Sequence, residues 1–143
     1  MDREQLLRDL HRYGPESNAA AIELAECGDR AALPAILASI VSDCGWEIIP
    51  EQKIAAFVRL ADAGAVPLVV EYLEGLDEAE LEHDAGDISD QFWRVQTAIR
   101  RILLGIGRSV VSPVCTALAQ SRNRFTKECL EEVLAELGCP NEK

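Results

Sequence analysis

The chain has little of several residue types that mark common classes of protein. Phe, Trp and Tyr together make up 5% of its 143 residues, so the hydrophobic core must be mainly aliphatic. The two histidines, His11 and His83, are far apart in the sequence, whereas a structural zinc site needs four convergent ligands. No apolar run approaches the roughly 18 residues of a membrane span, and the N-terminal residues have no apolar signal region. We therefore expect no membrane association.

The cysteines do not form a recognisable metal or disulfide pattern. Their number is odd, and no two of them form a Cys-x-x-Cys pair: Cys27, Cys44, Cys115, Cys129 and Cys139. We therefore expect free thiols in the reducing cytoplasm. Neither a metal nor a cofactor is expected, and no catalytic residue can be named.

Composition and charge narrow the class of protein further. Hydrophobic residues make up 48% and charged residues 27%, as in ordinary globular proteins, and the length predicts one domain over residues 1–143. The net charge of −11 argues against a nucleic-acid partner, because nucleic acids attract cationic surfaces. It is compatible with a basic protein partner.

An internal repeat is the clearest pattern in the sequence. Four segments each show an aliphatic helix end followed by glycine: Leu24–Gly28, Leu60–Gly64, Leu103–Gly107 and Leu134–Gly138. A proline follows each glycine within a few residues, at Pro34, Pro67, Pro113 and Pro140. Glycine favours the left-handed backbone that closes a helix, and proline is tolerated in the first turn of the next one. The spacing of 36 and then 43 residues between the first three glycines is typical of helical-pair repeats.

Apolar residues recur at helical spacing on both sides of these turns. They predict helices over 31–43, 51–63, 66–76, 90–106, 109–121 and 124–137. The N-terminal stretch 2–13 places three leucines on one face and ends at Gly14-Pro15, as expected of a capping helix.

The Leu-Ala-x-x-Gly ends at 24–28 and 60–64, with the Ala-Leu-Pro-Ala-Ile-Leu start at 32–37, resemble HEAT-type repeats of the armadillo-like superfamily. The resemblance covers roughly residues 17–138. It implies an all-α fold, a right-handed α-solenoid of about three HEAT-like helical hairpins with an N-terminal capping helix. The expected units are a capping helix at 1–14, helical pairs at 15–44, 50–77 and 89–121, and a terminal helix at 123–138.

Charge is distributed unevenly along the chain. Nine acids and no base lie between Glu71 and Asp90, and seven bases and no acid lie between Arg94 and Lys127. The favoured interpretation is a solvated surface on which adjacent repeats pair these charges internally, in keeping with the small contribution of exposed ion pairs. The acidic stretch could instead attract a basic partner. A third alternative, phosphate binding by the basic stretch, lacks the aromatic residues of a single-strand binder.

Candidate binding residues follow from the resemblance, which implies that the second helix of each pair lines the concave surface. The outward positions there would be Ser39, Asp43, Glu71, Glu74, Thr116 and Gln120, and the acidic connection at 77–90 adds Asp77 and Glu78. Trp46 and Trp93 complete the set, because tryptophan often anchors interfaces. For Trp93, packing against a neighbouring helix is the favoured alternative.

These features predict a non-enzymatic protein–protein interaction module that uses the concave surface and the acidic connection, with a basic protein as one partner class. A HEAT-like lyase or an accessory subunit of a modifying enzyme is the alternative. Homodimerisation through the 124–137 helix also stays open, because a truncated last repeat could expose apolar surface.

Overall fold

The computed structural model describes residues 2–12, 14–44, 49–75, 90–122 and 124–138. Throughout this part of the chain the secondary structure is helical, and no strand occurs. The prediction of an all-α chain is therefore confirmed.

The helix bounds follow the predicted periodicity to within a few residues. The α-helices are α1 (Arg3–Asp9), α2 (Pro15–Glu26), α3 (Leu33–Cys44), α4 (Glu51–Leu60), α5 (Val66–Glu74), α7 (Asp90–Ile106), α8 (Val111–Gln120) and α9 (Arg124–Glu136). A single turn of 3-10 helix precedes α3, α5 and α8, over Arg30–Ala32, Ala63–Ala65 and Arg108–Val110.

The repeated glycines end helices as predicted, with one exception. Gly28 and Gly107 have φ values of 71° and 100°, in the left-handed region that glycine enters without strain. Gly64 does not have a positive φ. Its backbone N–H instead donates to the Asp62 carboxylate at 2.8 Å, so an aspartate organises this turn.

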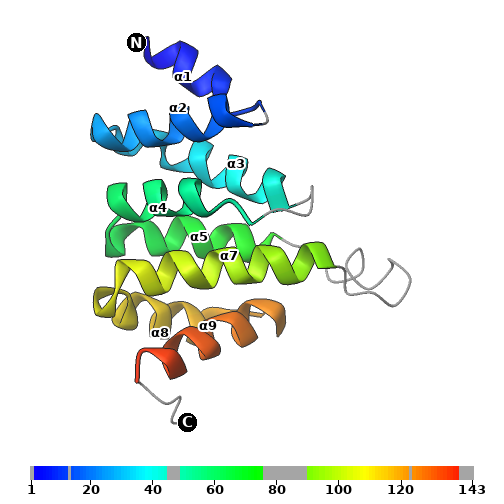
Figure 1. Ribbon diagram of the computed structural model, residues 1–143. Coiled ribbons are helices and arrows are strands. Elements are labelled where there is room, and N and C mark those ends of the chain that lie inside the picture. Colours follow the sequence, from blue (N-terminus) through cyan, green and yellow to red (C-terminus); the bar gives the residue numbers. More distant parts are fainter. Residues whose placement is uncertain (1, 13, 45–48, 76–89, 123, 139–143) are drawn as a thin grey trace.

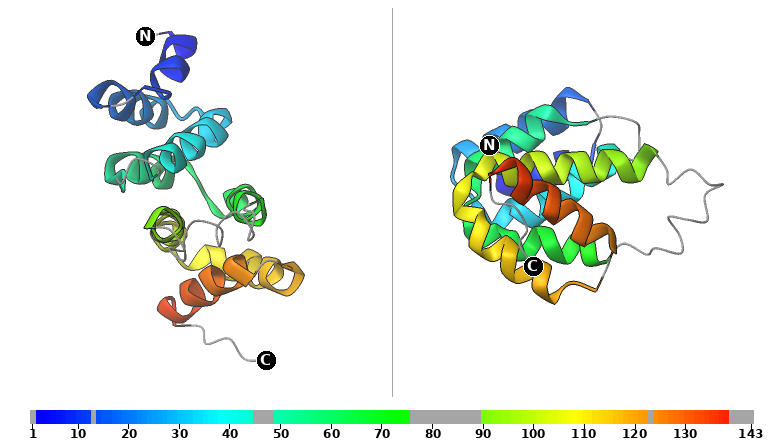
Figure 2. Two further views of the ribbon diagram at one scale, coloured as in Figure 1. Left: turned by 90° about the vertical axis from the view of Figure 1, so that its right-hand side faces the viewer. Right: turned by 90° about the horizontal axis from the view of Figure 1, so that it is seen from below.

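The helices stack in chain order from α1 at one end to α9 at the other (Figure 1). Two layers are visible when the molecule is turned (Figure 2). In the first layer α2 packs on α4, α4 on α7, and α7 on α9. In the second layer α5 packs on α8 and also contacts α9, whereas α3 packs on α4 and α7.

The core between the layers is aliphatic, as the composition predicted. Within the described residues, Phe57 is the only aromatic side chain among the fully enclosed core positions. The same core cluster includes Ile36 of α3 and Ile99 and Leu103 of α7, all with 0% exposure. Burial of such side chains contributes about 1.5–3 kcal/mol each relative to leaving them exposed.

Candidate partner-binding groove

Helices α5 and α8 border an open groove of about 540 Å³. The groove lies where two helices of the second layer pack side by side. The lining residues are Val66, Pro67, Val70, Glu71, Glu74, Pro113, Thr116, Ala117 and Gln120. Its size is within the range of about 300–1,000 Å³ typical of ligand-binding clefts.

Four predicted binding residues meet in this groove. Glu71 and Glu74 of α5 and Thr116 and Gln120 of α8 are all exposed and all line it. The packing of α5 on α8 brings them together although more than 40 residues separate the two pairs in the sequence. All four positions are thus exposed, and their role in binding stays a prediction.

The apolar wall of the groove was not predicted. It consists of Val66, Pro67 and Val70 on α5 and Pro113 and Ala117 on α8. A signal for part of it was present, because Val70 precedes Glu74 by four residues and Ala117 precedes Gln120 by three. Residues at these spacings share one face of a helix.

The two glutamates of the groove have no cationic partner within the described chain. Glu71 and Glu74 form no ion pair there, and no Lys or Arg lines the groove. The Thr126 hydroxyl of α9 donates to Glu74 Oε2 at 3.5 Å, a long contact. The groove is therefore anionic on one side and apolar on the other.

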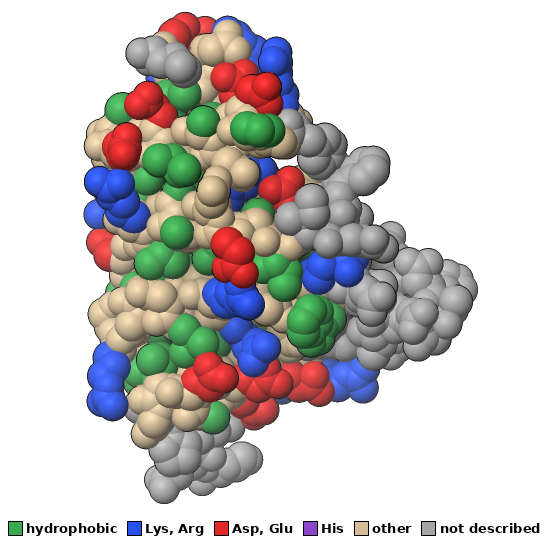
Figure 3. All heavy atoms as spheres, viewed as in Figure 1, with side chains coloured by type: hydrophobic (Ala, Val, Ile, Leu, Met, Phe, Trp, Pro, Cys, Tyr) green, Lys and Arg blue, Asp and Glu red, His purple; other side chains and the backbone are tan. Residues whose placement is uncertain are grey.

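The opposite face, formed by α2, α4, α7 and α9, carries charges of both signs close together (Figure 3). Arg100 of α7 pairs with Glu132 of α9 at 3.1 Å, and Arg101 of α7 pairs with Glu51 of α4. These two arginines belong to the basic stretch, and their partners lie outside the 71–90 acidic stretch. Internal pairing between the two stretches is thus not what neutralises Arg100 and Arg101.

Ser39 and Asp43 correct the sequence prediction, which placed both on the outer surface. They are buried, with exposures of 3% and 8%. The Lys53 ammonium of α4 donates to Asp43 Oδ2 at 2.6 Å and to Ser39 Oγ at 2.8 Å. α3 packs on α4 and α7, so these two polar residues face other helices, whereas Ser42 of the same helix is exposed.

The buried network continues to the N-terminal helix. Ser39 Oγ and Ser17 Oγ both donate to the backbone carbonyl of Leu10, at 2.7 and 2.9 Å. Leu10 caps the C-terminal end of α1, where helix carbonyls lack intrahelical partners. The network therefore joins α1, α2, α3 and α4, and it accounts for the burial of Ser39 and Asp43.

Of the two tryptophans and the acidic connection, only Trp93 lies in the described part of the chain. The Trp93 side chain is 56% exposed at the start of α7, so the favoured expectation that it packs against a neighbouring helix is wrong. Trp46, Asp77 and Glu78 lie outside the described residues. Trp93 is not part of the groove between α5 and α8.

The four cysteines in the described part of the chain form an exposed pair and a buried pair, and Cys139 lies outside the described residues. Cys27 and Cys115 are exposed free thiols, and Cys44 and Cys129 are buried free thiols. Burial raises the pKa of Cys44 to about 11 and that of Cys129 to about 12. Desolvation also raises the pKa of Tyr72, which is half-buried on α5. The two buried thiols are therefore neutral and unreactive near neutral pH.

The described residues offer neither a metal-binding cluster nor a single helix suited to span a membrane. Across the described residues, no three His, Cys, Asp or Glu side chains come together to hold a metal ion. No single described helix has the length and apolar character of a membrane span. The segments Trp93–Ile106 and Arg108–Gln120 meet these criteria only when taken together, and they are bent by 106°.

Comparison with known proteins gives no match to a protein-family model, to a curated protein or to a solved structure.

Proposed function

We propose that the chain is a HEAT-like α-solenoid that acts as a non-enzymatic protein-binding module. Glycine-ended helices at a spacing near 40 residues and the stacking of helices in chain order support the repeat architecture. Repeat proteins of this kind commonly use an extended surface for binding. The odd number of cysteines supports a place in the cytoplasm, where thiols stay reduced.

The groove between α5 and α8 is the observation that carries this proposal. It combines an apolar wall, which can bury partner side chains, with exposed polar residues, which can orient them. Two unpaired glutamates at its edge favour a basic partner, because complementary charge speeds association and excludes wrong partners. Residues from two different hairpins contribute, so the surface depends on the stacked arrangement.

Site-specific photo-cross-linking can show whether a partner protein binds in the groove. A photoreactive amino acid replaces Ala117, which lines the groove, and the matched control replaces Ala119, which is exposed on the same helix outside it. We expect one identified protein from the native host to be cross-linked from position 117 and not from position 119. The same protein cross-linked equally from both positions, or from neither, would contradict the proposal.

A further inference from the structure

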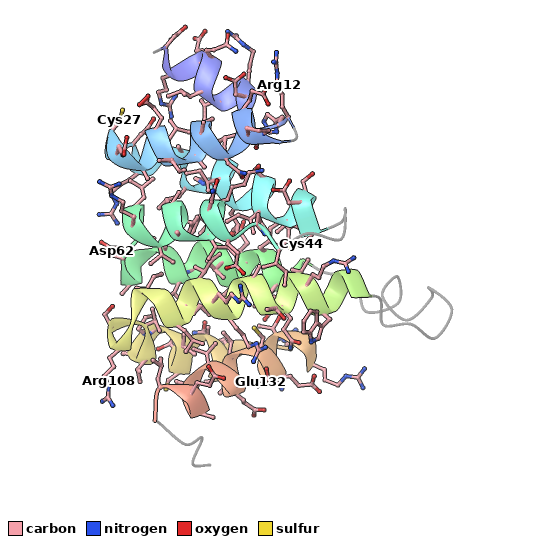
Figure 4. All side chains as sticks on the ribbon, viewed as in Figure 1. Arg12, Cys27, Cys44, Asp62, Arg108 and Glu132 are labelled. Atoms are coloured by element: carbon pink, nitrogen blue, oxygen red, sulfur yellow. The ribbon has the colours of Figure 1, made fainter. Side chains whose placement is uncertain are left out.

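The groove has two chemically different ends. α5 and α8 run in the same direction, because the turns before them, marked by Asp62 and Arg108, lie along one edge of the molecule (Figure 4). Val66, Pro67 and Pro113 therefore gather at the end where both helices begin. Glu74 and Gln120 lie at the end where both helices finish, and Glu71 lies one turn before Glu74.

The end with the glutamates is anionic. The last turns of α5 and α8 contribute Glu74 and Gln120 to it, and a helix C-terminus carries a partial negative charge of about half a unit, which the N-terminal turn of α9 opposes where Thr126 contacts Glu74. Glu71 and Glu74 add two carboxylates that no described Lys or Arg neutralises. A cation placed there would interact favourably with the two carboxylates.

The length of the groove sets the spacing that a ligand must match. α5 has nine residues, which span about 12 Å at a rise of about 1.5 Å per residue. An aliphatic group against Val66 and Val70 and a cation beside Glu74 would therefore be about 10 Å apart at most. Two side chains of one short segment, or the long stem and charged head of one Lys or Arg, fit this distance.

We infer that the groove binds a cationic amphipathic segment of the partner protein in one orientation. Aliphatic groups of that segment pack on Val66, Val70 and Ala117, and a Lys or Arg head lies beside Glu71 and Glu74. This inference rests on the proposed function and specifies the chemistry of its partner. The apolar wall provides contact area, and the anionic end provides direction.

Three alkyl probes of equal length test the inference without a known partner: n-hexylammonium, n-hexanol and n-hexanoate. Each is titrated into the isotopically labelled full chain at pH 7, and the backbone amide resonances of Val70, Glu74 and Ala117 report on binding. We expect n-hexylammonium to bind about tenfold more tightly than n-hexanoate, with n-hexanol between them. Added salt at about 0.5 M should reduce this preference, because it screens exposed charges.

Matched variants show whether the preference for n-hexylammonium over the other two probes arises in the groove. Glu71→Gln/Glu74→Gln should remove the difference between n-hexylammonium and n-hexanol and leave n-hexanol binding unchanged. The control Glu4→Gln/Glu16→Gln removes two exposed carboxylates from α1 and α2, at the far end of the stack, and should leave the preference intact.

The outcomes separate this inference from the proposed function. Equal binding of the three probes, tighter binding of n-hexanoate, or no shifts in the groove would overturn the inference. The cross-linking result from Ala117 would still decide the proposed function by itself. A solution dimer that Ala117→Trp dissociates would identify a second copy of this chain as the occupant and would also overturn the inference.

Discussion

At the scale of single residues, the burial of Lys53 organises the N-terminal half of the molecule. Its side chain is 1% exposed, and its ammonium contacts Asp43 and Ser39 at hydrogen-bonding distance. A buried charge is tolerated only when it is paired and hydrogen-bonded, and both conditions are met here. Such a pair contributes little net stability, but the loss of one member leaves the other charge buried alone.

Lys53→Met should therefore destabilise the protein strongly. We expect the free energy of unfolding to fall by about 3–5 kcal/mol, because Asp43 would lose its buried partner. The double variant Asp43→Leu/Lys53→Met should recover most of this loss, since it removes both charges. Urea denaturation followed by circular dichroism measures both effects.

An exposed ion pair provides the control for this experiment. Arg30 and Asp62 are 2.7 Å apart and both more than half exposed, so Arg30→Met should change the free energy of unfolding by less than about 1 kcal/mol. A similar loss for Lys53→Met and Arg30→Met would show that the buried pair has no special role.

The burial of the thiols predicts which of them react in the folded protein. At pH 8 a thiol-specific reagent should modify Cys27 and Cys115 rapidly in the folded protein, and Cys44 and Cys129 only after unfolding. The reason is that reaction needs an accessible thiolate, and burial raises the pKa of both inner thiols above the usual 9.0. Peptide mapping by mass spectrometry identifies the modified residues. Modification of Cys44 or Cys129 as fast as Cys27 would contradict the structure.

The same pKa shifts predict a loss of stability in alkaline solution. The unfolded chain releases the protons of Cys44 and Cys129 near pH 9, whereas the folded chain holds them to about pH 11 and 12. The stabilisation is therefore fully present below about pH 9 and is lost as the pH rises toward 12. Cys44→Ala/Cys129→Ala should weaken this part of the pH dependence in denaturation curves, and an unchanged pH dependence would contradict it.

At the scale of helices, close approach between α4 and α7 depends on a glycine. A Cβ atom added at Gly105 of α7 would lie 2.9 Å from a methyl group of Val58 on α4. Contacts this short force a neighbour to move, and Val58 is β-branched and therefore stiff. Gly105 thus acts within α7, where it lets α4 approach, rather than in the turn that Gly107 forms.

Gly105→Ala should lower the free energy of unfolding by about 1 kcal/mol. Overpacking typically costs about 1–3 kcal/mol, and the better helix propensity of alanine offsets up to about 1 kcal/mol of it. In a Val58→Ala background the same change should be neutral or stabilising. Thermal denaturation of the four proteins gives the coupling between the two sites, and additive effects would exclude a steric contact.

Helices were more predictable from the sequence than their outward faces. Glycine and proline act locally, so the ends of α2 and α7 at Gly28 and Gly107 follow from the residues themselves. Which face of a helix is covered depends on neighbours distant in sequence. Asp43 was predicted outward, although it lies against a lysine ten residues later, and Lys53 was overlooked although it shares a face with buried Phe57.

The candidate groove was predictable in part for the same reason. Its polar edge followed from treating α5 and α8 as second helices of their pairs, whereas its apolar wall required knowledge that α5 packs on α8. Trp93 was misjudged because its exposure depends on how helices distant in sequence pack around it.

At the scale of the whole molecule, the two faces differ in how their charges are satisfied. On the face formed by α2, α4, α7 and α9, arginines pair with glutamates of neighbouring helices, as Arg100 does with Glu132. In the groove between α5 and α8, Glu71 and Glu74 have no such partner in the part of the chain that the structure describes. A net charge of −11 adds a long-range attraction for basic proteins to this local difference.

Calorimetric titration can test directly whether the partner binds in the groove between α5 and α8. The cross-linked partner, once purified, is titrated into three forms of this chain. Ala117→Trp places a large side chain in the groove, and Ala119→Trp places the same side chain on the same helix outside it. We expect Ala117→Trp to weaken binding by about tenfold or more, equivalent to at least about 1.4 kcal/mol, and Ala119→Trp to bind like the unmodified chain. Equal affinity of all three forms would show that the partner does not occupy the groove.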